Sequence, residues 1–111
     1  MIRISLHHDG EGRLERIVVQ GHAGYAEAGE DIVCAAVSGI SIGLANASET
    51  LLGVTVVQDA DEEEGGYLDC RIPEELEPDK RKQVRFLLEA MAASLQSVAD
   101  EHSAYVQMNR Y

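Results

Sequence analysis

Hydrophobic and polar residues alternate strictly at the start of the chain. Ile2, Ile4 and Leu6 are separated by polar residues, which is the period of two typical of a strand with one buried face. A second run over residues 14–20 is rich in β-branched side chains and follows a glycine-containing turn at 9–12. The pattern therefore predicts a β-hairpin.

After Asp31 the apolar residues no longer recur at every second position but follow the period of a helix. This period predicts a helix from Ile32 to about Leu52, with Asp31 as its N-cap and Gly53 ending it. One face of this helix is expected to carry Val33, Ala36, Val37, Ile40, Leu44, Ala47 and Leu51. Before it, residues 21–31 contain three glycines and few large apolar groups, so a mobile surface loop is expected there.

The second half of the chain repeats the succession of two strands and a helix. Strands are predicted over 54–58 and 67–72, joined by an acidic turn over 59–66 that includes Glu62-Glu63-Glu64. A helix from about Asp79 to His102 should bury Val84, Leu87, Leu88, Met91, Leu95 and Val98, and a last strand covers 105–108. The order β-β-α-β-β-α-β predicts a single α+β domain over 1–111, with five strands in a mostly antiparallel or mixed sheet and two helices.

Charge and composition limit the possible partners. The formal net charge is −11, with 20 acidic against 9 Lys and Arg residues, which disfavours binding to nucleic acid or to an anionic membrane surface. A basic protein would be attracted instead. We expect no apolar run long enough to span a membrane, and the N-terminus lacks a signal-peptide pattern, so a cytoplasmic protein is expected.

A histidine, a carboxylate and a thiol lie close together in the sequence, at His22, Asp31 and Cys34. A cysteine in the first turn of a helix is stabilised as thiolate by unpaired N–H groups and by the helix dipole. The loop would let His22 fold back onto the sulfur and act as general acid and base. The N–H groups of Cys34 and Ala35 are candidates for an oxyanion hole. Asp31 could cap the helix, orient the imidazole, or do both.

The pattern alone leaves other interpretations open. A cysteine in an apolar helix is often a small core residue, as Cys70 is expected to be in its alternating strand. A zinc site would require four convergent ligands from residues such as His7, His8, His22 and Cys34, and no metal or other cofactor is expected. Two functions without catalysis are alternatives: an acidic adaptor that binds a basic ribosomal protein or assembly factor, and a redox sensor that pairs Cys34 with Cys70.

A resemblance to a known family distinguishes among these possibilities. Gly21-His22-Ala23, followed by Gly29-Glu30-Asp31-Ile32-Val33-Cys34-Ala35-Ala36-Val37-Ser38, closely resembles the signature of the ribosomal-processing cysteine proteases, the Prp family. Chain length and element order resemble that family as well, so the similarity covers essentially the whole chain.

The resemblance implies a specific function. Members of the family remove a short N-terminal extension from a large-subunit ribosomal protein, and they act as homodimers. By similarity, Cys34 would be the nucleophile and His22 its acid and base partner, with Asp31 at an acidic position of the motif. The residues expected near the substrate are Gly21, Ala23, Gly24 and Ser38.

Overall fold

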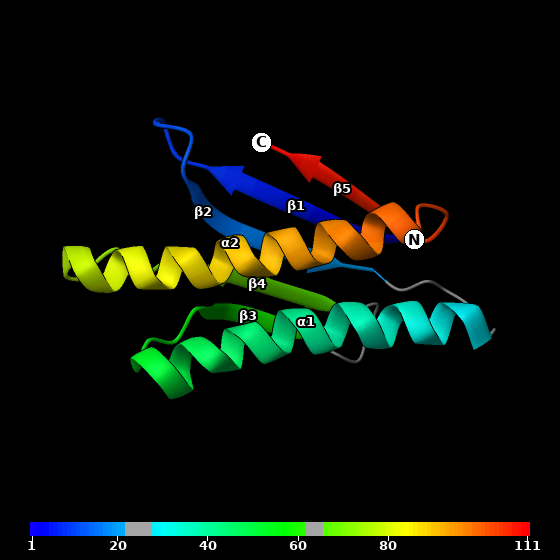
Figure 1. The fold of residues 1–111 in the computed structure, drawn as a ribbon, viewed down its shortest axis with the longest axis horizontal. Helices are drawn as coiled ribbons and strands as arrows, with labels where there is room; N and C mark the ends of the chain where they lie inside the picture. Colours follow the sequence, from blue (N-terminus) through cyan, green and yellow to red (C-terminus); the bar gives the residue numbers. More distant parts are fainter. Residues whose placement is uncertain (22–27, 62–65) are drawn as a thin grey trace.

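Both helices of the molecule cover the same face of one sheet (Figure 1). The computed structural model describes residues 1–21, 28–61 and 66–111, with the backbone alone for 28–31. Within these ranges the order of elements is β-β-α-β-β-α-β, and the sheet contains antiparallel and parallel pairs. The predicted α+β class, element order and mixed sheet are confirmed.

The bounds of the elements differ from the predicted ones mainly at α1 and β3. The strands are β1 (Ile2–His8), β2 (Leu14–Gln20), β3 (Val57–Asp61), β4 (Tyr67–Arg71) and β5 (Val106–Arg110), and the helices are α1 (Ala28–Leu52) and α2 (Pro78–Glu101). Helix α1 thus begins four residues before the predicted start, and β3 begins three residues later than predicted. The first residues of the expected acidic turn belong to β3, and Glu62-Glu63-Glu64 lies outside the described residues.

The strands are arranged in the order β3-β4-β2-β1-β5. The predicted hairpin of β1 and β2 forms the centre with β4, and β5 pairs parallel to β1. The Asp9 carboxylate accepts hydrogen bonds from the backbone N–H groups of Glu11 and Arg13, and Gly12 has a φ of 79°. These bonds fix the hairpin turn. Glycine is suited to position 12, because few other residues adopt such a φ.

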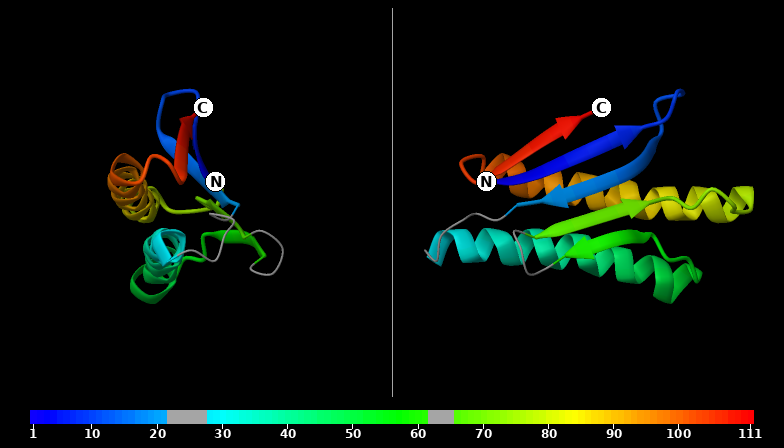
Figure 2. Two further views of the ribbon diagram at one scale, coloured as in Figure 1. Left: turned by 90° about the vertical axis from the view of Figure 1, so that its right-hand side faces the viewer. Right: turned by 180° about the vertical axis from the view of Figure 1, so that it is seen from behind.

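The hydrophobic core lies between the sheet and the two helices, which pack side by side (Figure 2). Strand β1 contributes the alternating residues Ile2, Ile4 and Leu6, as predicted. Helix α2 buries Val84, Leu88, Met91, Leu95 and Ala99, whereas Leu87 and Val98 are only half-buried. The opposite face of the sheet is not covered by either helix.

The buried face of α1 is narrower than predicted and partly polar. Val33 and Val37 are buried as expected, but Leu51 is 71% exposed. Ser41 and Ser48 are buried instead, and their hydroxyls donate to the carbonyl oxygens of Val37 (2.7 Å) and Val54 (2.8 Å). Helix α1 packs chiefly against α2 rather than against the sheet, so only a narrow stripe of it reaches the core.

The expectation that no apolar run approaches the length of a membrane span is wrong. Residues 32–52 form a helical segment of 21 residues that is long and apolar enough to cross a membrane, judged by length and composition alone. Such segments also occur as core helices of globular domains. Here Val33 and Val37 from this segment join the core with residues of the sheet and α2.

Candidate active site

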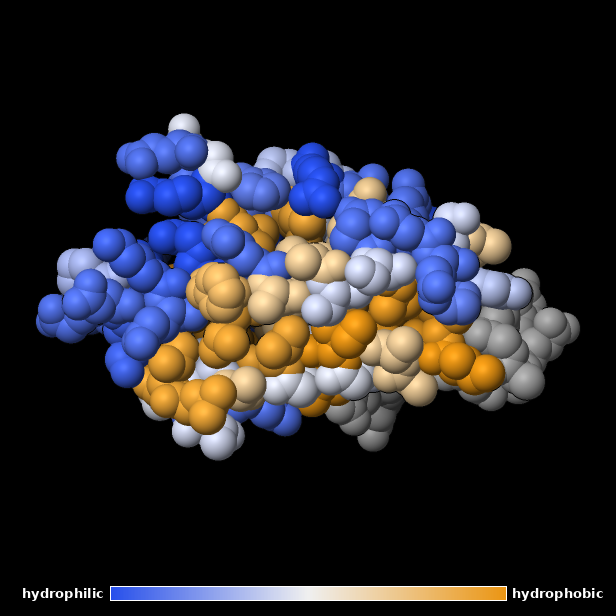
Figure 3. Space-filling model, viewed as in Figure 1, coloured by the Kyte–Doolittle hydropathy of each residue, from blue (hydrophilic) through white to orange (hydrophobic). Residues whose placement is uncertain are grey.

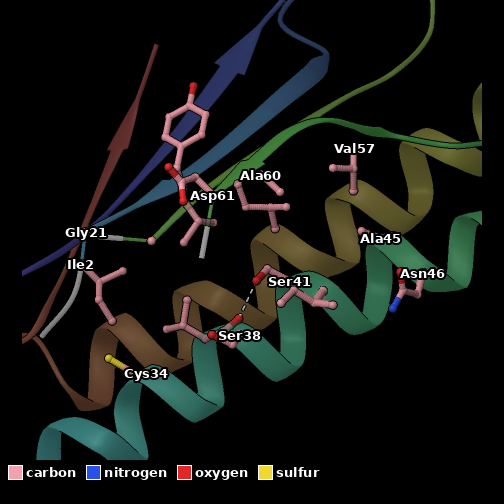
Figure 4. A pocket seen from close by; sticks show the side chains of 16 residues that line it. Ile2, Gly21, Cys34, Ser38, Ser41, Ala45, Asn46, Val57, Ala60 and Asp61 are labelled. Atoms are coloured by element: carbon pink, nitrogen blue, oxygen red, sulfur yellow. Dashed lines mark hydrogen bonds between the residues drawn. The ribbon is translucent and has the colours of Figure 1, made fainter. Parts of the chain in front are cut away.

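A groove of about 510 Å³ separates α1 from the sheet (Figure 4). One wall is formed by α1 and the other by β3 and β4. Cys34 lies at one end, near Ile2 and Gly21, whereas Asn46 and Val57 lie at the other end (Figure 4). Because α1 packs against α2, the space between α1 and β3 is left open to a ligand.

Cys34 is half-buried and lines this groove. It is the seventh residue of α1, so it lies in the second helical turn rather than the first. The N–H groups of Cys34 and Ala35 are therefore inside the helix, where each N–H bonds to the carbonyl four residues earlier. The predicted oxyanion hole from these two groups is wrong for this helix, because its unpaired N–H groups lie nearer Ala28.

The start of α1 also changes the interpretation of Asp31. As the fourth residue of the helix, Asp31 does not occupy the N-cap position, so the predicted cap is wrong. A carboxylate in the first turn is still favoured by the helix dipole. Its side chain lies outside the described part of the chain, as do His22, Ala23 and Gly24, so their predicted roles stay predictions.

Gly21 and Ser38 are the two predicted substrate-binding residues that the structure describes, and both line the groove. Ser38 is exposed on α1, one helical turn after Cys34. Gly21 has a φ of 90°, and a Cβ at this position would lie 2.5 Å from the carbonyl oxygen of Met1. Its N–H donates to the carbonyl oxygen of Gly66 (2.9 Å). Glycine is therefore required at the residue that leads directly into His22.

Cys70 lies in a very different environment from Cys34. It is 0% exposed on β4, and burial, with a contribution from the neighbouring Asp69 carboxylate, raises the pKa of its thiol to about 12. Both cysteines are free thiols. A redox pair of Cys34 and Cys70 is therefore not formed in this structure, and Cys70 is the core residue that its strand pattern predicts.

Asp69 was not predicted as a notable residue, yet it is only 3% exposed on the face of the sheet away from the helices. Arg16 donates to both carboxylate oxygens at 3.0 Å, and Arg71 donates from the other side at 3.0 Å. Burial acts to raise the pKa of Asp69, but the hydrogen bonds and charges of the two arginines outweigh it and hold the pKa below its ordinary value. This cluster faces away from the groove and stabilises the sheet.

Several groove residues were missed by sequence reasoning. They are Ile42, Ala45 and Asn46 on α1, and Val57, Ala60 and Asp61 on β3. The helix pattern assigned α1 a broad core face, and Ala60 and Asp61 were assigned to a turn. Among the described residues no group of three or more His, Cys, Asp or Glu side chains could hold a metal ion.

Comparison with known proteins found curated relatives that match nearly the whole chain. The chain is 32% identical to the ribosomal processing cysteine protease Prp of Bacillus subtilis, over 92% of this chain and 90% of that protein. It is 28% identical to the protein of the same name from Staphylococcus aureus, over 98% of both chains.

Solved structures of similar proteins cover nearly the whole chain. The crystal structure of SMU.848 from Streptococcus mutans has a TM-score of 0.85 at 34% identity, covering 99% of this chain and 93% of that chain. The Staphylococcus aureus protease Prp in complex with a substrate peptide has a TM-score of 0.75 at 26% identity, with both chains fully covered. The same protease with a covalently linked product peptide has a TM-score of 0.74 at 27% identity, again over the full length of both chains.

The profile of one family, cysteine protease Prp, matches residues 1–107 of this chain. Nearly the entire fold is included in this match, from β1 to the start of β5, together with the groove and its cysteine. The chain is therefore a cysteine peptidase and belongs to the Prp family.

Proposed function

We propose that this peptidase removes the short N-terminal extension of a large-subunit ribosomal protein. The observation that carries the proposal is the position of Cys34, half-buried at one end of a groove large enough for a peptide. Support comes from the relatives named as ribosomal processing proteases, and from the Staphylococcus aureus protease bound to substrate and product peptides.

The proposed chemistry is acyl transfer through a Cys34–His22 pair. The Cys34 sulfur, after losing its proton to His22, bonds to the carbonyl carbon of the scissile peptide. His22 then returns the proton to the leaving amine as the C–N bond breaks. Water hydrolyses the resulting thioester and regenerates the thiol. Asp31 is proposed to orient the imidazole.

The charge of the enzyme favours a basic substrate. A net charge of −11 attracts the basic chain of a ribosomal protein and repels RNA, so we propose no direct nucleic-acid contact. The KM should therefore rise as salt is added, because screening weakens long-range attraction. A KM that is independent of ionic strength would remove this argument.

The decisive experiment mixes the extended ribosomal protein with wild type, Cys34→Ala and Cys70→Ala, and measures the mass of the products. Wild type and Cys70→Ala should release the N-terminal fragment, whereas Cys34→Ala should bind the substrate and leave it intact. Cys70→Ala is the matched control, because it removes a thiol that is absent from the groove. Binding without cleavage by every variant would favour the adaptor and contradict the peptidase.

We also propose that the protein acts as a homodimer in the cytoplasm, with no membrane contact. An apolar surface at the junction of α1 and α2 supports the dimer (Figure 3): Leu51 and Phe86 are each 71% exposed and, with Leu52 and Leu87, line a shallow hollow of about 350 Å³. Two free thiols are consistent with a reducing compartment, and the core residues of α1 are consistent with a globular domain.

Light scattering tests the dimer. Wild type should have twice the monomer mass, and Phe86→Glu should shift it toward monomer because a charge would be buried at the contact. Tyr111→Glu, at an exposed aromatic residue outside the hollow, serves as the control. A monomeric wild type at micromolar concentration would contradict the proposal.

A further inference from the structure

Strand β3 is at an edge of the sheet. In the order β3-β4-β2-β1-β5 it pairs with β4, and no other described strand pairs with it. Half of the backbone N–H and C=O groups of an edge strand point away from its partner, which makes such an edge a template for an added strand. Gln58, Asp59, Ala60 and Asp61 of β3 are all exposed.

This edge borders the groove that contains Cys34. Figure 4 shows Val57 above Ala45 and Asn46, whereas Asp61 lies nearer the Cys34 end, so β3 and α1 run in opposite directions along the groove. From Cys34 to Asn46 the helix rises by about 18 Å. From Val57 to Asp61 strand β3 extends over about 13 Å. The strand therefore runs beside most of the helix wall.

We infer that the substrate peptide binds as an extended strand on the edge of β3 that faces away from β4, between β3 and α1, with its scissile bond at Cys34. This inference rests on the proposed peptidase function and adds how the substrate is held. Strand addition is a recurrent mode of peptide recognition, in which main-chain hydrogen bonds give affinity and pockets receive alternate side chains. Here the small side chains of Ser38, Ser41 and Ala45 leave room on the helix wall.

Strand addition predicts a specific pattern when single substrate amides are N-methylated. Successive amides of a strand point in opposite directions, so only every second amide would face β3. Binding of a peptide spanning the cleavage site to the Cys34→Ala protein should weaken about tenfold when an amide facing β3 is methylated. The alternate positions should change less than about twofold.

Cleavage and the N-methyl scan test two different things: the peptidase activity and the added strand. Cleavage of the unmodified peptide by wild type tests the peptidase independently of how the peptide lies. If that cleavage occurs and the methyl scan shows no alternation, either because binding never changes or because consecutive positions are equally sensitive, the added strand is wrong and the peptidase stands.

A substitution at Ala60 of the enzyme tests the same contact between the substrate peptide and β3. Ala60 is exposed and lines the groove, and tyrosine is a good strand former, so Ala60→Tyr should fill the space next to β3 without disturbing the core. We expect KM to rise about tenfold with kcat changed less than about twofold. Gln107→Tyr is the matched control, at an exposed position of the opposite edge strand β5.

The Ala60→Tyr result requires that the fold be intact. Far-ultraviolet circular dichroism should show the same spectrum for wild type and both tyrosine variants, and Gln107→Tyr should keep the wild-type KM. An Ala60→Tyr protein with native spectrum and unchanged KM would overturn the assignment of this edge to the substrate.

Discussion

The two cysteines of this chain illustrate how location determines the chemistry of one residue type. Cys34 lies on a helix that packs against another helix and leaves an open groove beside it. Cys70 lies on β4, flanked by β2 and β3 and covered by the core. A thiol must be reachable by a substrate and must lose its proton to act as a nucleophile. Cys70 meets neither condition, because it is 0% exposed and burial raises its pKa to about 12.

The surroundings of the two residues differ in their side chains as well as in access. Next to Cys70, the Asp69 carboxylate is held by Arg16 from β2 and by Arg71 from its own strand. These bonds tie the two central strands together on the face that no helix covers. The helix wall of the groove beyond Cys34 instead carries the small side chains of Ser38, Ser41 and Ala45. The core strand provides stability, and the groove provides space.

Alkylation should give the largest difference between the two thiols. With excess iodoacetamide near neutral pH, intact-mass measurements should show a first adduct on Cys34 at least about 100 times faster than a second on Cys70, because Cys70 is reached only through opening of the fold. In denaturant both should react at similar rates. Equal rates in the native protein would mean that β4 is not protected as described.

Asp69→Asn should weaken the core region without altering the groove. Removing the charge leaves two arginines without their shared partner, so the free energy of unfolding should fall by about 2 kcal/mol. Urea unfolding measures this change. Asp59→Asn is the control, since Asp59 is exposed and lies opposite Asp69 in register, and its effect should stay within about 0.5 kcal/mol. Equal effects would show that the arginines contribute little.

The sequence predicted the order of elements because each has a clear apolar period and clear breaks. The alternation of Ile2, Ile4 and Leu6 and the helical spacing from Val84 to Leu95 correspond to real buried faces. The error at β3 has a physical cause. Val54 and Val56 are buried in the connection that follows α1, so their apolar pattern reflects contact with the core. The carbonyl oxygen of Val56 accepts one hydrogen bond from the backbone N–H of Arg71 on β4, but the strand itself begins only at Val57.

The candidate site was predictable only where residue chemistry or the family resemblance singled out a residue. Cys34, Gly21 and Ser38 were identified in advance, and all three line the groove. Ala60 and Asn46 were not, because nothing in the sequence indicates which strand forms the sheet edge. Asp69 was missed for a related reason, since its two arginine partners become neighbours only through the pairing of β2 with β4.

Replacing each cysteine by alanine should separate stability from activity. Cys70→Ala removes a fully buried sulfur and should lower the free energy of unfolding by about 1 kcal/mol, whereas Cys34→Ala should change it by less than about 0.5 kcal/mol. Thermal or urea unfolding of the two variants provides the measurement. A larger loss for Cys34→Ala would mean that this side chain packs as a core residue rather than facing the groove.

Lowering the pH should reduce the contribution of Asp69 to the free energy of unfolding, and this is the smallest of the expected effects. Because its folded pKa lies below the ordinary value of 3.8, the carboxylate stabilises the fold at pH values above about 4, and this contribution is lost as the pH falls through the folded pKa. The difference in unfolding free energy between wild type and Asp69→Asn should therefore narrow between pH 7 and pH 3. Other acids, such as Asp9, titrate equally in both proteins and cancel in the difference. If the difference in unfolding free energy between the two proteins became larger in acid, burial and not the two arginines would determine the pKa shift of Asp69.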